Sequence, residues 1–247
     1  MSSKLRLGYA LLSALVVSAA SCSAQSDDTS HGPPTPSPSG GAPDWALIGA
    51  SPPPRAPTDK EGLATELPDV FNLAIGSIPA DIKSGQPGRD VTDFRNNQSY
   101  YWVSVGAKNI RILRISVRRE KSIAAAKSWI LGQRKGLSGN PGPASGEGAA
   151  ETGRAENLTG LGDEAFTFWM KQNDLPQGTG SARSKYNVGG AFICARQKNV
   201  WISITLEGAD GLQGAASGRS ISGTPLPFAP SRDQEVSIAR SIFSGMR

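Results

Sequence analysis

The sequence predicts an α+β fold in which an antiparallel sheet carries helices on one face. Apolar residues alternate with polar ones in several segments, most clearly across residues 200–206, and this period of two is typical of strands. Amphipathic helical patterns follow two of these segments, from about Ser122 and from Ser231. Strands grouped with occasional helices, instead of a strict alternation, favour the α+β class.

The first 21 residues have the pattern of an export signal. Lys4 and Arg6 precede an apolar run from Leu7 to Ala20, and small residues follow. A membrane-spanning helix needs about 20 apolar residues, and this run is shorter. We therefore expect a signal peptide at residues 1–21, which is removed on export.

The segment Ala19-Ala20-Ser21-Cys22 resembles the lipobox of bacterial lipoproteins. That resemblance implies cleavage before Cys22, a diacylglycerol on its sulfur and a fatty acyl chain such as palmitate on its amino group. It also implies an anchor on the extracytoplasmic face of the cell membrane. The alternative is ordinary secretion, with cleavage after Ala20 or Ala24.

Residues 22–59 are rich in proline, serine and glycine and poor in large apolar side chains. Such a segment buries too little apolar surface to offset the entropy of ordering it, so we expect a disordered stalk. Residues 60–247 then form a single α+β domain of ordinary size.

Charge and cysteine content narrow the classes of function. Removing residues 1–21 lowers the formal net charge from +5 to +3, which argues against a nucleic-acid-binding protein. With Cys22 lipidated, Cys194 is the only other cysteine and has no partner for a disulfide. Cys194 alternates with Phe192 on a predicted inward face, so a buried structural thiol is favoured over a nucleophile.

The first half of the domain predicts two short helices, a hairpin and a longer helix. Thr58 and Glu61 could form a capping box for a helix that ends before Pro68, and a second helix follows to Gly76. A polar loop then extends to Ser99. The next two elements are strands at 101–105 and 113–117, joined by a turn at 106–109, with a bulge where the apolar phase slips between Ile112 and Leu113.

The second half predicts strands and a terminal helix. The helix from Ser122 ends at Gly136, and a loop covers residues 138–153. Strands follow at 166–170, 192–194 and 200–206. Residues 207–230 are predicted to be a long loop, either disordered or a lid, before the helix from Ser231.

Lys108-Asn109 and Lys198-Asn199 each stand at a predicted hairpin turn. Each leads into a strand and is followed by an amphipathic helix, which suggests two related strand–strand–helix units. Alternatively, Lys-Asn is simply a favourable turn dipeptide, because asparagine tolerates left-handed backbone.

Motifs for catalysis and cofactors are weak. Gly160–Ala165 matches G-x-G-x-x-A, but a strand-like sequence follows it, so a turn is favoured over a nucleotide site. The single histidine, His31, lies in the stalk, and we expect no catalytic residue, metal or cofactor in the domain. Four carboxylates remain as candidates for a hydrolase: Asp163, Glu164, Glu207 and Asp210.

Five side chains are weak candidates for ligand binding. Arg114 and Arg118 form a basic edge on the polar face of their strand, where charges usually only face solvent. Trp102, Trp169 and Trp201 fall opposite the main aliphatic stripes. They either cover the sheet or, if exposed together, form an apolar patch for a partner.

The lipobox, the stalk, the GLGDEAF turn and the KNVWISITL strand together resemble secreted lipoproteins of actinobacterial cell envelopes that carry a domain of unknown function. Some of these are similar to extracellular sensor domains of membrane kinases. The resemblance implies a non-enzymatic, membrane-anchored protein that binds an unidentified envelope ligand or protein partner. The alternatives are a carboxylate-dependent envelope hydrolase and a structural spacer without a specific ligand.

Overall fold

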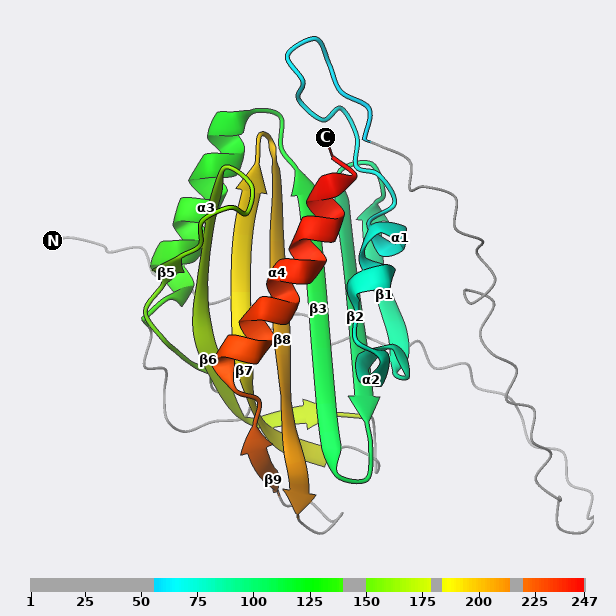
Figure 1. The fold of residues 1–247 in the computed structure, drawn as a ribbon, viewed down its shortest axis with the longest axis vertical. Helices are drawn as coiled ribbons and strands as arrows, with labels where there is room; N and C mark the ends of the chain where they lie inside the picture. Colours follow the sequence, from blue (N-terminus) through cyan, green and yellow to red (C-terminus); the bar gives the residue numbers. More distant parts are fainter. Residues whose placement is uncertain (1–55, 140–149, 179–183, 214–219, 247) are drawn as a thin grey trace, which may run out of the picture. The chain divides into compact units, whose positions relative to one another are not determined.

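The computed structural model describes residues 56–139, 150–178, 184–213 and 220–246, all within the unit Pro52–Arg247 (Figure 1). The predictions for the signal peptide, Cys22 and the stalk as far as residue 55 lie outside these residues. Within the described ranges, no helix has the length and apolar character that crossing a membrane requires.

The described residues form one sheet of nine strands, and every pairing is antiparallel except a short parallel contact between β7 and β9. The strands are β1 (Gln86–Asp93), β2 (Asn97–Val105), β3 (Asn109–Arg119), β4 (Ala150–Thr152), β5 (Glu156–Asn157), β6 (Glu164–Gln177), β7 (Ser184–Gln197), β8 (Val200–Gln213) and β9 (Ser220–Pro225). The main path runs β1-β2-β3-β8-β7-β6, with β4 and β5 on the outer edge of β6.

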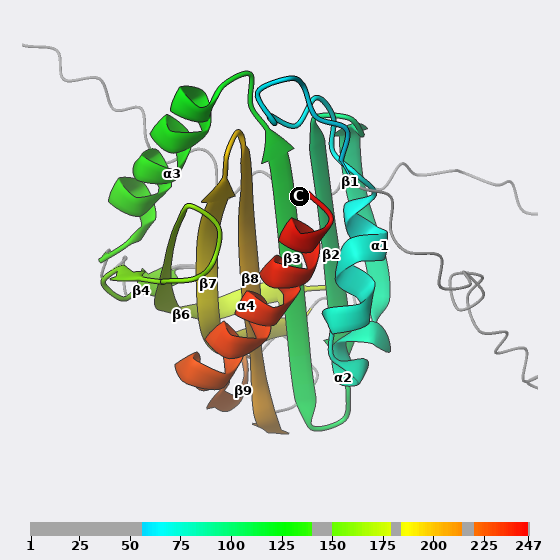
Figure 2. The ribbon, with the colours of Figure 1, turned by 45° about the horizontal axis from the view of Figure 1, so that its top comes forward.

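Helices cover both faces of this sheet. They are α1 (Val70–Ala74), the 3-10 helix η2 (Ile75–Ser77), α2 (Ala80–Lys83), α3 (Ile123–Leu137) and α4 (Phe228–Ser244). The face that α4 crosses diagonally is called the front face here, and α1 lies beside α4 on it (Figures 1 and 2). The opposite face is the back face.

The front-face core comes from the strand alternation that the sequence shows. Ile115 of β3 stands directly opposite Ile204 of β8, and both point toward α4, whose Ile238 and Ile242 are fully buried. Aliphatic side chains of this size contribute about 1.5–3 kcal/mol each when fully buried. This stripe therefore holds α4 on the sheet.

The back face is apolar at two places. Under α3, Phe166, Phe192 and Cys194 pack against Ile130. Farther along the sheet, the ends of β6 and β7 turn behind β3 and β8 and form a cluster that includes Ile112 (Figures 1 and 2).

The structure confirms the α+β class and the antiparallel sheet. The bulge predicted between Ile112 and Leu113 is absent. The pairing of β3 with both neighbours is continuous through Ile112 and Leu113. Ile112 is buried on the back face and Leu113 on the front face, so both are apolar because both faces are covered. The same double coverage places α3 on the face opposite α4, so the prediction that the helices lie on one face was wrong.

Both predicted hairpins are present, and β3 and β8, which follow the two turns, pair with each other. At the second turn Lys198, rather than Asn199, has the left-handed backbone, with φ 53°. The Asn199 side chain instead bonds the backbone N–H and carbonyl of Ala64. The helices after the two hairpins lie on opposite faces.

Three other predictions were wrong. Residues 58–67 form no helix, because the Asp59 carboxylate accepts the backbone N–H groups of Glu61 and Leu63 and stabilises a turn instead. The predicted loop 207–230 is largely ordered: β8 continues to Gln213, β9 follows, and α4 begins at Phe228, while residues 214–219 lie outside the description. Strand β1 was expected to be part of a loop.

Candidate functional site

Between the two covered regions, the back face carries polar side chains. We call this set the polar strip: Ser99, Tyr101, Arg114, Ser116, Arg118, Ser203 and Thr205. Strand pairing places them together, because Arg114 stands between Tyr101 of β2 and Thr205 of β8. All seven are at least partly accessible to solvent.

Arg114 is fixed by a buried acid. Its Nη1 donates to Oε1 of Glu207 at 3.1 Å, and the Glu207 side chain is fully buried while 44% of the Arg114 side chain is exposed. Burial raises the pKa of Glu207, and the charge and hydrogen bond of Arg114 act against that rise. No described residue bonds the second carboxylate oxygen. The pair therefore holds a solvent-accessible guanidinium at a defined place on the sheet.

Arg118 lies at the other end of the strip and is also oriented by an acid. Its Nε lies 3.2 Å from Oε1 of Glu120, and the indole N–H of Trp201 donates to the same oxygen at 3.1 Å. The ring of Trp201 stacks on Trp129 of α3, with centroids 3.3 Å apart. Trp201 is only 6% exposed, so it joins α3 to the sheet and supports Arg118 indirectly.

Small hydroxyl side chains occupy the space between the two arginines. Ser99 and Ser116 are hydrogen-bonded to each other at 3.0 Å, and Ser203 stands next to Ser116 on β8. Arg114 and Arg118 are four residues apart on one strand, which corresponds to about 13 Å. The surface therefore offers two guanidinium groups on either side of a row of hydroxyls, which suits a polar ligand with several oxygen atoms.

The five predicted ligand-binding candidates do not all meet. Arg114, Arg118 and Trp201 share the back face, where Arg118 and Trp201 are direct neighbours across the strands. Trp102 is buried on the front face against Phe71 and Tyr100 of the core. Trp169 stands on β6 on the face opposite the strip and is 38% exposed. The three tryptophans therefore do not form one patch.

The four carboxylate candidates pair with three arginines. Asp163 and Glu164 pair with Arg196, Asp210 pairs with Arg111, and Glu207 pairs with Arg114. As predicted, the segment Gly160–Ala165 is a turn leading straight into β6, and Asp163 accepts the backbone N–H of Lys198 there. In the part of the chain that the structure describes, no group of three His, Cys, Asp or Glu side chains could hold a metal.

A buried acid that the sequence analysis missed lies on α4. Glu235 is fully buried, and its Oε1 accepts the backbone N–H of Leu206 at 2.7 Å. Burial raises its pKa well above the ordinary value, and the nearby Glu207 adds to the rise. The sequence carried a signal, since Glu235 falls on the same helical face as Ile238 and Ile242.

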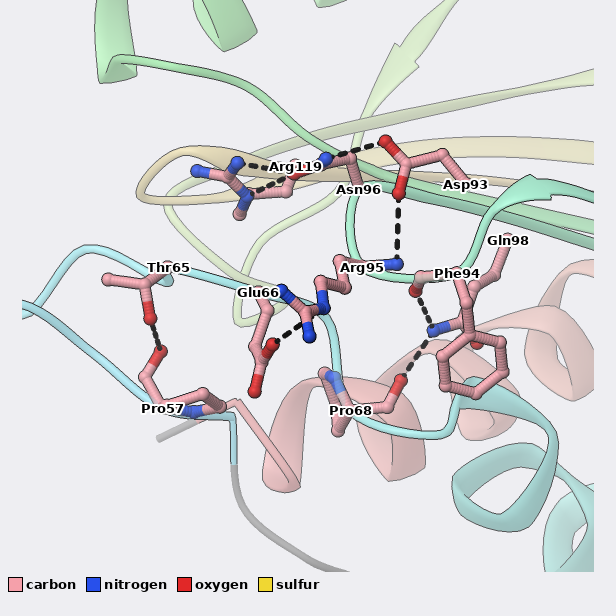
Figure 3. Close-up of polar contacts among 10 residues, drawn as sticks. All are labelled: Pro57, Thr65, Glu66, Pro68, Asp93, Phe94, Arg95, Asn96, Gln98 and Arg119. Carbon is pink, nitrogen blue, oxygen red and sulfur yellow. Dashed lines mark hydrogen bonds and ion pairs between the residues drawn. The ribbon is translucent and has the colours of Figure 1, made fainter.

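The third arginine of this strand end, Arg119, has a structural role. It donates from Nε to Oδ1 of Asn96 at 2.7 Å, and Asn96 donates to Asp93 in the β1–β2 turn (Figure 3). Next to this turn, Gln98 donates to the carbonyls of Pro68 and Phe94 (Figure 3). These contacts attach the segment before α1 to the sheet.

Two shallow cavities lie away from the polar strip. One, of about 280 Å³, lies between the β5–β6 segment and α4, with Leu161, Val236 and Arg240 in its lining. The other, of about 400 Å³, lies beside the β2–β3 turn and includes Asp81 and Asn109. Neither contains a residue of the polar strip, which is an open surface of the sheet.

The fold and this surface define a class: an α+β protein with one antiparallel sheet, helices on both faces and a partly open polar back face. No family model matches the chain, and no curated protein matches its sequence significantly. Among solved structures, the chain is similar to the extracellular domain of PknH from Mycobacterium tuberculosis. The match has 9% identity, a TM-score of 0.37 and covers 60% of this chain and 62% of that chain, and it carries no functional assignment.

Proposed function

We propose that this protein is a non-enzymatic binding protein of the extracytoplasmic membrane face, anchored through lipid on Cys22. In this proposal, residues 1–21 are the signal peptide, residues 22–59 are the stalk, and residues 60–247 are the binding domain. The polar strip, an accessible polar region of the back face that lies between two packed clusters, is the observation that carries the binding role.

The ion pair beneath the strip supports a binding role more than a stabilising one. A buried ion pair contributes little to stability compared with apolar residues of similar size. The physical effect of Glu207 is instead to hold Arg114 in one place, with nearly half of its side chain accessible. A positioned arginine binds carboxylate or phosphate oxygens well, because less side-chain entropy is lost on binding.

The two alternatives have less support in the geometry. A hydrolase would require two accessible carboxylates facing one ligand, whereas Asp163 and Glu164, the two candidates that lie together, are both bound by Arg196. A spacer without a ligand has no need of an exposed arginine that a buried acid holds in place. We therefore favour a ligand or protein partner that reaches the strip from solvent.

The binding role is tested with purified protein immobilised and incubated with solubilised envelope lipids and glycans, with retained compounds measured by mass spectrometry. We expect the variant Arg118→Gln with Thr205→Val to retain its ligand about tenfold less than the native chain, since each charge-assisted bond contributes about 1.5–3 kcal/mol. The matched control Arg95→Gln removes an arginine whose side chain is 81% exposed and lies outside the strip, and it should retain the ligand fully. Equal losses in both variants would contradict the proposal.

The anchor is tested separately, by fractionation and intact mass. Two or three acyl chains are needed for stable attachment, because one chain binds only marginally. We expect the native chain to carry the added mass and to remain with membranes, and Cys22→Ala to be released. A Cys22→Ala chain that still fractionates with membranes, together with a native mass lacking acyl chains, would show that the anchor is wrong.

A further inference from the structure

Helix α3 presents an exposed face that combines lysines with aliphatic side chains. We define the outer face of α3 as Ile123, Lys127, Leu131 and Lys135, which recur every four residues along one side of the helix. The buried residues Ala126 and Ile130 lie on the side that packs against the sheet. We infer that the outer face of α3 lies on an anionic lipid surface, an inference that rests on the proposed membrane anchor.

Charge is the first argument for this partner. Residues 121–137 contain four basic side chains and no acidic one: Lys121, Lys127, Arg134 and Lys135. Among the described residues, none forms an ion pair with any of the three lysines. Arg134 differs, since it donates to Asn157 and lies over the ring of Phe166.

The acidic groups near α3 do not cancel this charge. Glu120, just before the helix, is already bound by Arg118 and Trp201. Glu151 and Glu156 are exposed on β4 and β5, which approach the C-terminal end of the helix. The N-terminal two-thirds of the outer face is therefore free of neighbouring carboxylates among the described residues.

The apolar part of the outer face is the second argument. Ile123 is 44% exposed and Leu131 is 41% exposed, although single exposed aliphatic residues are common at protein surfaces. Here they alternate with lysines on one stripe of a helix. This pattern is typical of helices that lie in the membrane interface, where aliphatic groups enter the headgroup region and lysine ammonium groups reach the phosphates.

The tether allows this docking. The 33 residues between Cys22 and Ala56 could span up to about 100 Å if extended, so an anchor at Cys22 permits α3 to reach the bilayer. Because α3 and the polar strip lie on the same face and are joined through the Trp129–Trp201 stack, docking would hold the strip close to the lipid headgroups. A ligand of the strip would then be a molecule near the membrane surface.

The test measures how fast individual lysines react with a water-soluble acetylating reagent. The full lipid-anchored chain is reconstituted in vesicles of phosphatidylcholine, alone or mixed with phosphatidylglycerol, and modification is read by mass spectrometry. On the anionic vesicles we expect Lys121, Lys127 and Lys135 to react about fivefold more slowly. Lys108, exposed at the β2–β3 turn, serves as the internal control with unchanged reactivity. Raised salt should remove the protection.

A charge-reversal pair provides the matched variants. Lys127→Glu with Lys135→Glu should abolish the protection of Lys121, and the control Lys108→Glu should preserve it. Equal lysine reactivity on both vesicle types, in a chain that floats with the vesicles, would overturn the inference and leave the anchor intact. A chain that does not float would contradict the anchor instead. In that case, lysine reactivity would be compared for the unanchored chain with and without excess anionic vesicles. Equal reactivity of the α3 lysines in the two samples would overturn the inference.

Discussion

Replacing Glu235 by glutamine should change how stability depends on pH. Glu235 is buried in α4, and burial together with the neighbouring Glu207 raises its pKa well above the ordinary value. The folded protein therefore holds a proton at Glu235 that the unfolded chain loses above about pH 4.3. Glutamine keeps the oxygen that accepts the Leu206 N–H but carries no titrating proton.

The magnitude follows from proton linkage. The stabilising effect of a raised carboxyl pKa is fully present below the unfolded pKa and is lost as pH rises toward the folded pKa. One extra proton in the folded state lowers the free energy of unfolding by about 1.4 kcal/mol for each pH unit in that window. Glu207 contributes in the same direction, so the variant should remove one part of the slope.

The assay is denaturant unfolding of native protein and Glu235→Gln between about pH 5 and about pH 8. We expect the native curve to fall more steeply, and the variant to be the more stable of the two at the upper end. Glu235→Ala is the control for the hydrogen bond, because it leaves the Leu206 N–H without its acceptor and should be about 1–3 kcal/mol less stable than Glu235→Gln at every pH. Parallel curves for native protein and Glu235→Gln would refute a protonated Glu235.

Three further predictions concern packing. Gly190→Ala should destabilise the protein by more than about 3 kcal/mol or prevent folding, because the new Cβ would lie 1.9 Å from the Leu206 carbonyl oxygen. Gly132→Ala, at an exposed helical site with no atom within 4 Å, should stabilise it by about 1 kcal/mol, and a thermal melt that ranks the two variants otherwise would contradict this reasoning. Cys194 is fully buried, and burial raises its thiol pKa well above the ordinary value, so it should react with a thiol reagent only after denaturation. Rapid reaction in the native protein would show that the β6–β7 region opens.

Much of the sheet could be predicted because its signals are local. The alternation at residues 200–206 and the turns at Lys108 and Lys198 depend on neighbours in sequence, and the structure confirms both hairpins. The prediction of a bulge at Ile112 was wrong for a physical reason. A phase slip in apolar residues has two causes, a bulge or a change in which face is covered, and only distant segments decide between them.

In the candidate site too, the sequence predicted some residues, and only distant contacts decided the rest. The sequence identified Arg114, Arg118 and Trp201 but grouped them with Trp102 and Trp169, because residue type alone does not tell which face a strand presents to which helix. The sequence did not identify Glu235 as a buried acid, whereas the structure buries it against β8.

By itself, the sequence determined the strand and helix periods, the hairpin turns and the α+β class, because these follow from backbone geometry over a few residues. Only the tertiary structure decided that α3 and α4 lie on opposite faces and that β6 and β7 turn behind β3 and β8. Those choices leave the polar strip open and bury Glu207 beneath Arg114. They depend on contacts between residues far apart in the chain, whose free energies no local pattern encodes.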